Sequence, residues 1–230
     1  MSDPHDHHDH GHDHDHDHAH GHAHGPGHRH PPAADHDDTL TYFRKLEIAV
    51  RELLIEKNLF TADEIRAMVE NIESRTPEGG ARVVAKAWTD PAFKRRLLED
   101  ATKACESMGF EMALYDVTLN VVENTPEVHN LVVCTLCSCY PRMLLGLPPA
   151  WYKSRAYRSR VVREPRAVLK EFGLELPDTV AVRVHDSTAD LRYLVLPMRP
   201  AGTDGMSEAE LVPLVNRDSM IGTAVVPAPR

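Results

Sequence analysis

A helical repeat of apolar residues begins near residue 40. Leucine, phenylalanine and valine side chains recur every three or four positions between Leu40 and Leu54, which is the spacing of one helix face. Asn58 is expected to close this helix, and the Thr-Ala-Asp-Glu run at 61–64 has the form of a capping box that starts a second one. The apolar stripes of both helices predict packing on each other or on a second chain.

Helices are expected to continue as far as Gly109. The Pro-Glu-Gly-Gly run at 77–80 is expected to break the chain, and a further helix to cover Ala81–Trp88. Asp90 and Pro91 are typical of the N-cap and first residue of a helix, which Gly109 would then end. The first third of the patterned chain is therefore predicted to be helical.

Beyond Gly109 the pattern changes to short apolar runs mixed with helical stretches. Helices are predicted over Tyr157–Phe172, where Gly173 ends the run, and after a second capping box at 207–210. Strands are predicted over Val117–Val121, Leu131–Val133, Val180–Val184, Tyr193–Leu196 and Ile221–Val226. This irregular mixture of helices and strands indicates the α+β class.

The first 38 residues differ from the rest, because histidine alternates there with aspartate before glycine and proline take over. They contain 14 of the 16 histidines. Almost none of these side chains can be buried, so 1–38 is predicted to be a disordered tail. The tail is either a metal-scavenging segment, since imidazoles bind cobalt, nickel and zinc ions, or a passive solubilising arm or part of a purification tag. A helical arm over 39–109 and a second domain over 110–230 are expected to follow.

Composition narrows the class of protein. Hydrophobic residues make up 42% of the 230-residue chain, which is enough for a sizeable core. The sequence has no apolar run near the roughly 20 residues of a membrane span, and its polar start lacks the apolar segment of a signal peptide. A cytoplasmic protein without membrane attachment is therefore expected. The net charge of −9 disfavours a general nucleic-acid binder, and the basic run at 153–166 is interpreted as a partner interface or a solvated helix.

Three of the four cysteines lie within six residues, as Cys134, Cys137 and Cys139. A disulfide framework would distribute its cysteines along the chain, so this C-x-x-C-x-C run indicates metal or redox chemistry. Three thiolates from one tight turn can occupy three positions around a single metal ion. The fourth cysteine, Cys105, falls within a predicted helix and is expected to be a core residue.

The single residue between Cys137 and Cys139 adds a second kind of donor. Their sulfurs can bind in one plane only if the intervening backbone nitrogens also approach the metal. Deprotonated amides and thiolates are strong donors that favour low-spin trivalent cobalt or iron over zinc. A structural zinc site is the alternative, with Cys105 or His129 as its fourth ligand. A buried, inert cysteine cluster is a further alternative, although it would be prone to oxidation.

The segment Val133–Cys139 resembles the metal-binding signature of nitrile hydratase α subunits, and the resemblance runs collinearly from about residue 40 to residue 226. The matching segments outside the signature are Val121–Thr125, Val128–Asn130, Leu145–Pro149, Trp151–Lys153, Arg163–Arg166, Arg192–Tyr193, Arg199–Thr203 and Arg217–Gly222. The resemblance implies a helical arm followed by a layered α-β-β-α catalytic domain.

The resemblance also implies a role for each residue of the signature. Cys134 would be the unmodified axial thiolate, Cys137 a cysteine sulfinic acid and Cys139 a cysteine sulfenic acid. The backbone nitrogens of Ser138 and Cys139 would complete the plane, and water or substrate would take the sixth position. Thr135 stands where the iron enzymes have serine, which favours Co(III) over iron.

The implied reaction is the hydration of a small nitrile to its amide, which is a lyase activity. The trivalent ion would polarise the nitrile or activate water, and either water or the Cys139 sulfenate oxygen would attack the nitrile carbon. Asp190 and Arg192 resemble an acid-x-Arg pair that orients groups near the site, and the alternative is an ordinary surface ion pair. The implied partners are a β subunit, in an α2β2 heterotetramer, and a cobalt-insertion activator protein.

Thiocyanate hydrolase, whose γ subunit carries the same signature, is the strongest competitor. The histidine-rich tail and Arg142 favour it, whereas Glu164, Asp190 and the Val-Glu-Asn-Thr run favour nitrile hydratase. The stretch between Gly109 and Asp116 departs from the family's glycine-rich pattern, which leaves substrate contacts there open. A non-catalytic cobalt-binding or assembly protein is the third hypothesis.

Four other side chains are expected to be structural. His129 and His185 flank predicted strands and are interpreted as histidines with satisfied hydrogen bonds. Trp88 and Trp151 are interpreted as packing or interface anchors.

Overall fold

The computed structural model describes residues 40–112 and 117–229, so the predicted tail over 1–38 and residues 113–116 lie outside the described part. Its strands are β1 (Thr118–Glu123), β2 (Val128–Val133), β3 (Ala181–Asp186) and β4 (Leu191–Leu196). Its helices are α1 (Tyr42–Glu56), α2 (Ala62–Glu73), α3 (Glu78–Thr89), α4 (Pro91–Glu99), α5 (Ala101–Glu106), α6 (Arg142–Leu145), α7 (Ala150–Lys153), α8 (Arg155–Arg160), α9 (Pro165–Glu171), α10 (Glu208–Leu211), the 3-10 turn η2 (Val212–Leu214) and α11 (Arg217–Ile221).

The strands form two parallel pairs, β1 with β4 and β2 with β3. Parallel partners need a long connection, and here each pair joins strands that are far apart in the sequence. The four residues after β1 lead directly into β2, so one short turn links the two sheets. Leu119 and Val121 of β1 are buried while their neighbours Thr118 and Asn120 are exposed, as the alternating pattern predicted.

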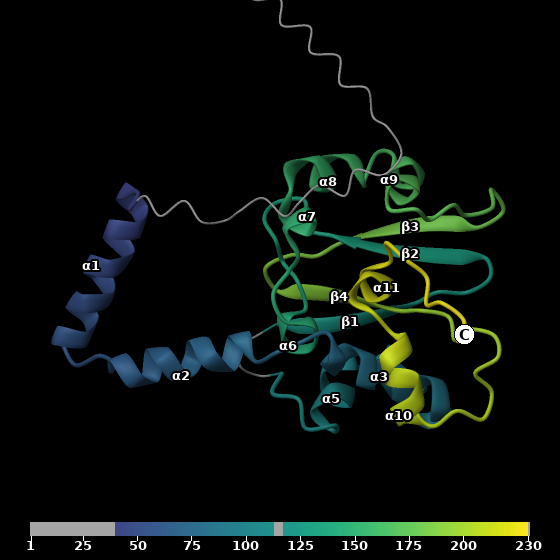
Figure 1. Ribbon diagram of the computed structural model, residues 1–230, viewed down its shortest axis with the longest axis horizontal. Helices are drawn as coiled ribbons and strands as arrows, with labels where there is room; N and C mark the ends of the chain where they lie inside the picture. Colours follow the sequence, from purple (N-terminus) through teal and green to yellow (C-terminus); the bar gives the residue numbers. More distant parts are fainter. Residues whose placement is uncertain (1–39, 113–116, 230) are drawn as a thin grey trace, which may run out of the picture. The chain divides into compact units, whose positions relative to one another are not determined.

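Helices cover the outer side of both strand pairs. Figure 1 shows α8 and α9 beyond β2 and β3, and α3, α5 and α10 beyond β1 and β4. Helix α11 contacts both β2 and β4 between the two pairs. The predicted α+β class and the α-β-β-α layers are therefore confirmed, and the core fills the space between these layers.

Helices α1 and α2 form where the sequence predicted them. The Thr61 hydroxyl accepts a hydrogen bond from the Glu64 N–H at 3.1 Å, and the Glu64 carboxylate accepts one from the Thr61 N–H at 2.7 Å. Neither helix has a buried residue. Their apolar side chains therefore remain exposed or half-buried within the described chain, and Phe43 is 78% exposed. The division between a helical arm and a domain at residue 109 stays a prediction.

Two predicted boundaries among the helices are wrong. The run at 77–80 was expected to precede a helix that starts at Ala81. Instead, α3 begins at Glu78 and contains both glycines of the run. A Cβ at Gly80 would lie 2.5 Å from Leu145 Cδ2, so this glycine serves close packing. The helix expected from Pro91 to Gly109 is two helices, because Asp100 ends α4 and its side chain caps α5.

The same kind of correction applies to the second half of the chain. The helix predicted over Tyr157–Phe172 is divided into α8 and α9, and Pro165, which lacks an N–H, starts the second. The strand predicted over Ile221–Val226 is wrong. Asn216 caps α11 instead, and that helix includes Ile221 and ends at Gly222, whose φ of +92° is left-handed.

None of the helices in the described part of the chain is both long and apolar enough to cross a lipid bilayer.

Candidate metal centre

The cysteine turn begins where the β2–β3 ladder ends. Val133 and Asp186 are the last register partners of this parallel pair, and the Ser187 N–H donates to the Val133 carbonyl at 2.7 Å. Cys134 follows directly on β2, whose buried residues fix the direction in which the turn leaves the sheet. The apolar run before the cysteines therefore places them at the carboxyl end of a rigid strand.

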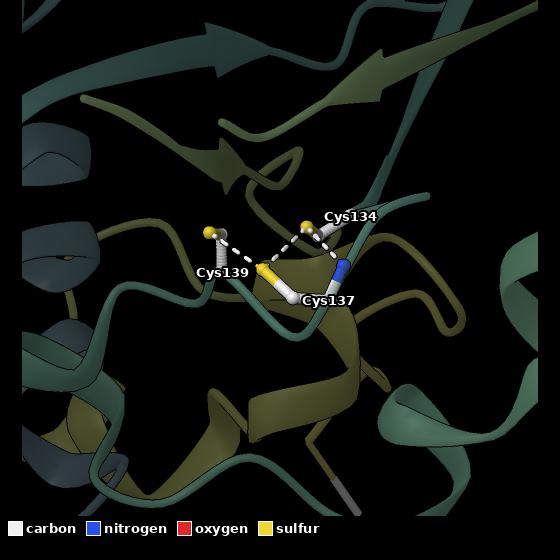
Figure 2. A group of neighbouring side chains, drawn as sticks. All are labelled: Cys134, Cys137 and Cys139. Atoms are coloured by element: carbon white, nitrogen blue, oxygen red, sulfur yellow. Dashed lines mark hydrogen bonds between the residues drawn. The ribbon is translucent and has the colours of Figure 1, made fainter. Parts of the chain in front are cut away.

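The structure brings the three predicted sulfur ligands together (Figure 2). The Cys137 sulfur lies 3.4 Å from that of Cys134 and 3.2 Å from that of Cys139. All three sulfurs lie within 4.8 Å of one another, so one ion can contact them all. The Cys137 N–H also donates to the Cys134 sulfur, at 3.3 Å. The turn is thus already folded into the shape of a three-sulfur claw.

The three thiols sit in different environments. Cys134 and Cys139 are only 1% and 9% exposed, whereas Cys137 is open to solvent. Hydrogen bonds from the Cys139 and Cys134 thiols lower the pKa of Cys137 to about 7. Burial raises the pKa of Cys139, against the opposing effect of the Arg192 positive charge. Cys137 therefore ionises more readily than Cys139, and a thiolate is the form that binds a metal.

Backbone amides accompany the sulfurs. The N–H groups of Ser138 and Cys139 also hydrogen bond toward the Cys137 sulfur and contribute to its lowered pKa. The assignment of these two amide nitrogens as metal ligands stays a prediction. A set of three sulfurs and two amide nitrogens fits an ion that prefers soft, strong donors.

The zinc alternative lacks its fourth ligand in the described chain. No other cysteine, histidine or carboxylate joins the cluster among residues 40–112 and 117–229. Cys105 is fully buried in α5, where burial raises the pKa of its thiol to about 12, and it is the core residue that was expected. His129 is buried, and its Nε2 donates to the Gly222 carbonyl at 2.7 Å. Its other ring nitrogen pairs with the Asn124 side chain, so neither nitrogen is directed to the cysteines. Structural zinc sites are almost always four-coordinate, so these residues do not fit one.

A carboxylate that the sequence analysis missed holds the first half of the turn. Asp186 accepts hydrogen bonds from the Thr135 N–H at 2.9 Å and from the Thr135 hydroxyl at 2.6 Å. The ladder between β2 and β3 has ended at this point, so the side chain of Asp186 serves the Thr135 N–H in place of a strand partner. The only signal in the sequence was an acid two residues after the strand predicted over Val180–Val184, and nothing in its spacing connects it to the cysteines.

Helices α7 and α8 hold the turn from another side. The Tyr152 hydroxyl donates to the Cys139 carbonyl at 2.8 Å, and the Tyr157 hydroxyl donates to the Val132 carbonyl at 2.7 Å. Arg158 donates to the Leu136 carbonyl at 3.0 Å. Arg158 belongs to the basic run that was interpreted as an interface or a solvated helix, and its contact with the turn was not anticipated.

The two residues of the predicted acid-x-Arg pair lie in different environments. The positive charge of Arg192 reaches Cys139, and its guanidinium donates to the Ala189 carbonyl at 2.9 Å. Asp190 is exposed, and its backbone carbonyl accepts from the Thr118 N–H. No ion pair joins Asp190 to Arg192 in the part of the chain that is described. The orienting role of Asp190 stays a prediction.

His185, Trp88 and Trp151, which were expected to be structural, have hydrogen-bond or packing partners within the fold. His185 Nε2 donates to the Asn130 side-chain oxygen at 2.8 Å. The Trp88 indole N–H donates to the Pro197 carbonyl at 2.9 Å, and Trp151 packs edge-on against Tyr157 and Phe172.

Fold and site together define a layered α+β metalloprotein whose three cysteine sulfurs meet on a turn at the end of a strand. The family model described as "Nitrile hydratase, alpha chain" matches residues 41–224. The chain belongs to this family.

Its relatives include subunits of both enzymes that the sequence left open, nitrile hydratase and thiocyanate hydrolase. The α subunit of the cobalt-containing nitrile hydratase of Pseudonocardia thermophila is 55% identical over 76% of this chain and 86% of its own length. The γ subunit of the thiocyanate hydrolase of Thiobacillus thioparus is 47% identical over 80% of this chain and 79% of its own. Among solved structures, a double mutant of the Fe-type nitrile hydratase of Comamonas testosteroni Ni1 superimposes with a TM-score of 0.75 at 42% identity, covering 82% of this chain and 95% of that one.

Proposed function

We propose that this chain is the metal-carrying α subunit of a cobalt nitrile hydratase, which adds water to the C≡N bond of a small nitrile and yields the amide. The observation that carries the proposal is the convergence of three cysteine sulfurs within 4.8 Å on one turn. The family membership supports the activity, and 55% identity to a cobalt-containing enzyme supports cobalt over iron. Thr135, which stands where the resemblance places serine in iron enzymes, supports it as well.

Cys134, Cys137 and Cys139 would hold the ion with their sulfurs, and Ser138 and Cys139 with their backbone nitrogens. Bound there, trivalent cobalt supplies a Lewis acid that polarises the nitrile or lowers the pKa of water. The net reaction places oxygen on the nitrile carbon and two protons on nitrogen, with no change in oxidation state.

The chain's own residues position these donors. Tyr152 fixes the carbonyl of Cys139, and Asp186 fixes Thr135, so both ends of the claw keep their orientation. Cys137 is exposed and its thiol has a lowered pKa, so it forms a thiolate more readily than the buried Cys139. We expect an external oxidant, dioxygen or a peroxide, to add two oxygen atoms to the Cys137 sulfur and one to the Cys139 sulfur, which gives a sulfinic and a sulfenic acid.

A β subunit is the partner that the family membership implies. The Leu136 side chain at the tip of the turn is 86% exposed, and the apolar stripe of α1 is uncovered in the described chain. Exposed apolar side chains of this kind are typical of a surface that a second chain covers. We propose an α2β2 assembly in the cytoplasm and a separate activator protein that inserts cobalt.

Thiocyanate hydrolysis is the second candidate, because a thiocyanate hydrolase subunit is 47% identical. Arg142, the first residue of α6, is half-buried and lies three residues after Cys139, where a positive charge could favour an anion. A cobalt-binding or assembly protein without activity is the third candidate.

One experiment separates the three candidates. The chain is co-expressed with a nitrile hydratase β subunit, the complex is purified, and the products from an aliphatic nitrile and from thiocyanate are measured. Amide from the nitrile, with little carbonyl sulfide from thiocyanate, is the expected result. The reverse preference supports thiocyanate hydrolysis, and a cobalt-loaded complex that turns over neither substrate supports the non-catalytic role.

A further inference from the structure

Arg158, in helix α8, hydrogen bonds to the backbone of the cysteine turn. Its Nη1 donates to the Leu136 carbonyl at 3.0 Å and to the Thr135 carbonyl at 3.4 Å. Its Nε donates to the carbonyl of Lys153, the last residue of α7, at 3.1 Å. A guanidinium presents its N–H groups in a rigid planar fork, so these contacts tie the turn to the α7–α8 corner in one orientation.

The Leu136 carbonyl shares a planar peptide group with the Cys137 N–H. That N–H donates to the Cys134 sulfur at 3.3 Å, so one peptide is held by Arg158 at its oxygen and by a sulfur at its nitrogen. A donor on the carbonyl oxygen also polarises the amide and strengthens its N–H as a donor. Arg158 therefore reaches the Cys134 sulfur through a single peptide group (Figure 2 draws its N–H···S end).

We propose that Arg158 is a positioning residue of the metal centre, which sets the donor strength of the Cys134 sulfur through the Leu136–Cys137 peptide. The inference rests on the proposed function, because it takes the three cysteines as cobalt ligands. Hydrogen bonds to a thiolate withdraw electron density from it and so tune the metal that it binds. Arg158 also keeps the turn closed before the metal arrives, which leaves less ordering for the metal to impose.

The test uses the purified two-subunit complex and two readouts other than activity. These are the position of the thiolate-to-cobalt charge-transfer band and the rate of cobalt release to a chelator. Arg158→Met removes the fork at similar side-chain length, and Arg158→Lys keeps the charge with a single ammonium group. Arg155→Met is the matched control, because Arg155 is exposed on the same helix and makes no hydrogen bond or ion pair through its side chain to the described residues.

Arg158→Met is expected to shift the band and to release cobalt roughly 10- to 100-fold faster than wild type, as for other groups that orient metal ligands. Arg158→Lys should give a band position and a release rate between those of wild type and Arg158→Met. Arg155→Met should match wild type in both readouts. A purely structural role for Arg158 would lower the melting temperature and leave the band where it is, and this outcome overturns the inference.

The two proposals fail in distinguishable ways. A wild-type complex that shows the band and an Arg158→Met complex that matches it in both readouts overturn the inference and leave the proposed function standing. A wild-type complex without a thiolate-to-cobalt band overturns the proposed function, and the inference with it. If Arg158→Met does not fold, judged by circular dichroism, then an Arg158→Lys complex identical to wild type overturns the inference.

Discussion

At the scale of single residues, the metal centre depends on side chains that carry no metal themselves. Asp186, Tyr152 and Arg158 each hydrogen bond to the backbone of the cysteine turn, at Thr135, Cys139 and Leu136 respectively. Such supporting contacts orient the ligands before a metal is bound and reduce the ordering that binding requires.

Replacing Asp186 with asparagine should weaken cobalt retention roughly tenfold, because the Thr135 N–H and hydroxyl lose a charged acceptor. The measurement is cobalt content after dialysis against a chelator. Asp190→Asn provides the comparison, since Asp190 is exposed and lies four residues further on. Lower turnover at unchanged cobalt content in Asp190→Asn would support its predicted orienting role, and equal cobalt loss in both variants would contradict the account of Asp186.

His129 provides a pH-dependent test of the fold. The Asn124 side-chain nitrogen can only donate, so the His129 Nδ1 accepts from it at 3.3 Å. The His129 Nε2 donates to the Gly222 carbonyl, and the ring is therefore neutral. Burial lowers the pKa of His129 below its ordinary value of 6.5. The stability that this neutral ring contributes is therefore present above pH 6.5 and is lost as pH falls through the lowered pKa.

The free energy of unfolding of the wild-type chain should thus fall relative to that of His129→Gln by up to about 1.4 kcal/mol per pH unit in this window. Urea denaturation at about pH 5 and about pH 7.5 measures the difference. His185 and the carboxyl groups are common to both proteins and cancel in the comparison. Parallel stability–pH curves for the two proteins would contradict the assigned neutral state.

At the scale of elements, the sequence predicted which segments form helices and strands better than where they end. The capping boxes at 61–64 and 207–210 and the alternation in β1 gave correct elements, because their signals are local. The end of α4 at Asp100 and the helical state of Ile221 were missed. Asp100 can equally well sit within a helix, and an apolar run such as Ile221–Val226 satisfies helix and strand patterns alike until its neighbours are known.

Gly222 is a point where element packing demands a specific residue. It has a φ of +92°, and a Cβ there would lie 2.0 Å from the backbone oxygen of Asn130 in β2. Gly173 has a similar φ of +84° with nothing within 4 Å of the same position. Gly173→Ala therefore isolates the cost of backbone strain, about 1 kcal/mol, whereas Gly222→Ala adds a clash of about 1–3 kcal/mol. Thermal denaturation should rank them in this order, and equal melting temperatures would refute the packing argument.

At the scale of the whole molecule, the sequence predicted which sulfurs form the site but not the side chains that hold the cysteine turn in place. The C-x-x-C-x-C spacing predicted the three sulfurs that the turn brings together. Arg158 and Asp186 were not predicted, because a basic run and an isolated acid carry no spacing that identifies their targets. Their contacts arise from the parallel pairing of β2 with β3 and from the α7–α8 corner, both of which are long-range features.

The uncovered stripe of α1 predicts a quaternary contact. Phe43 is 78% exposed, so Phe43→Ala should change the unfolding free energy of the isolated chain by less than about 0.5 kcal/mol. It should weaken association with the β subunit roughly tenfold, because aromatic side chains anchor interfaces. Lys45→Ala, an exposed polar position on the same helix, is the control. Sedimentation of the mixed subunits measures the affinity, and an unchanged affinity for Phe43→Ala would exclude α1 from the interface.

The cobalt X-ray absorption spectrum of the purified two-subunit complex tests the central claim most directly. The claw of Cys134, Cys137 and Cys139 with the amides of Ser138 and Cys139 predicts one six-coordinate, low-spin trivalent cobalt per α chain, with sulfur and nitrogen neighbours. A tetrahedral zinc ion at these cysteines, with cobalt absent, would contradict the claim.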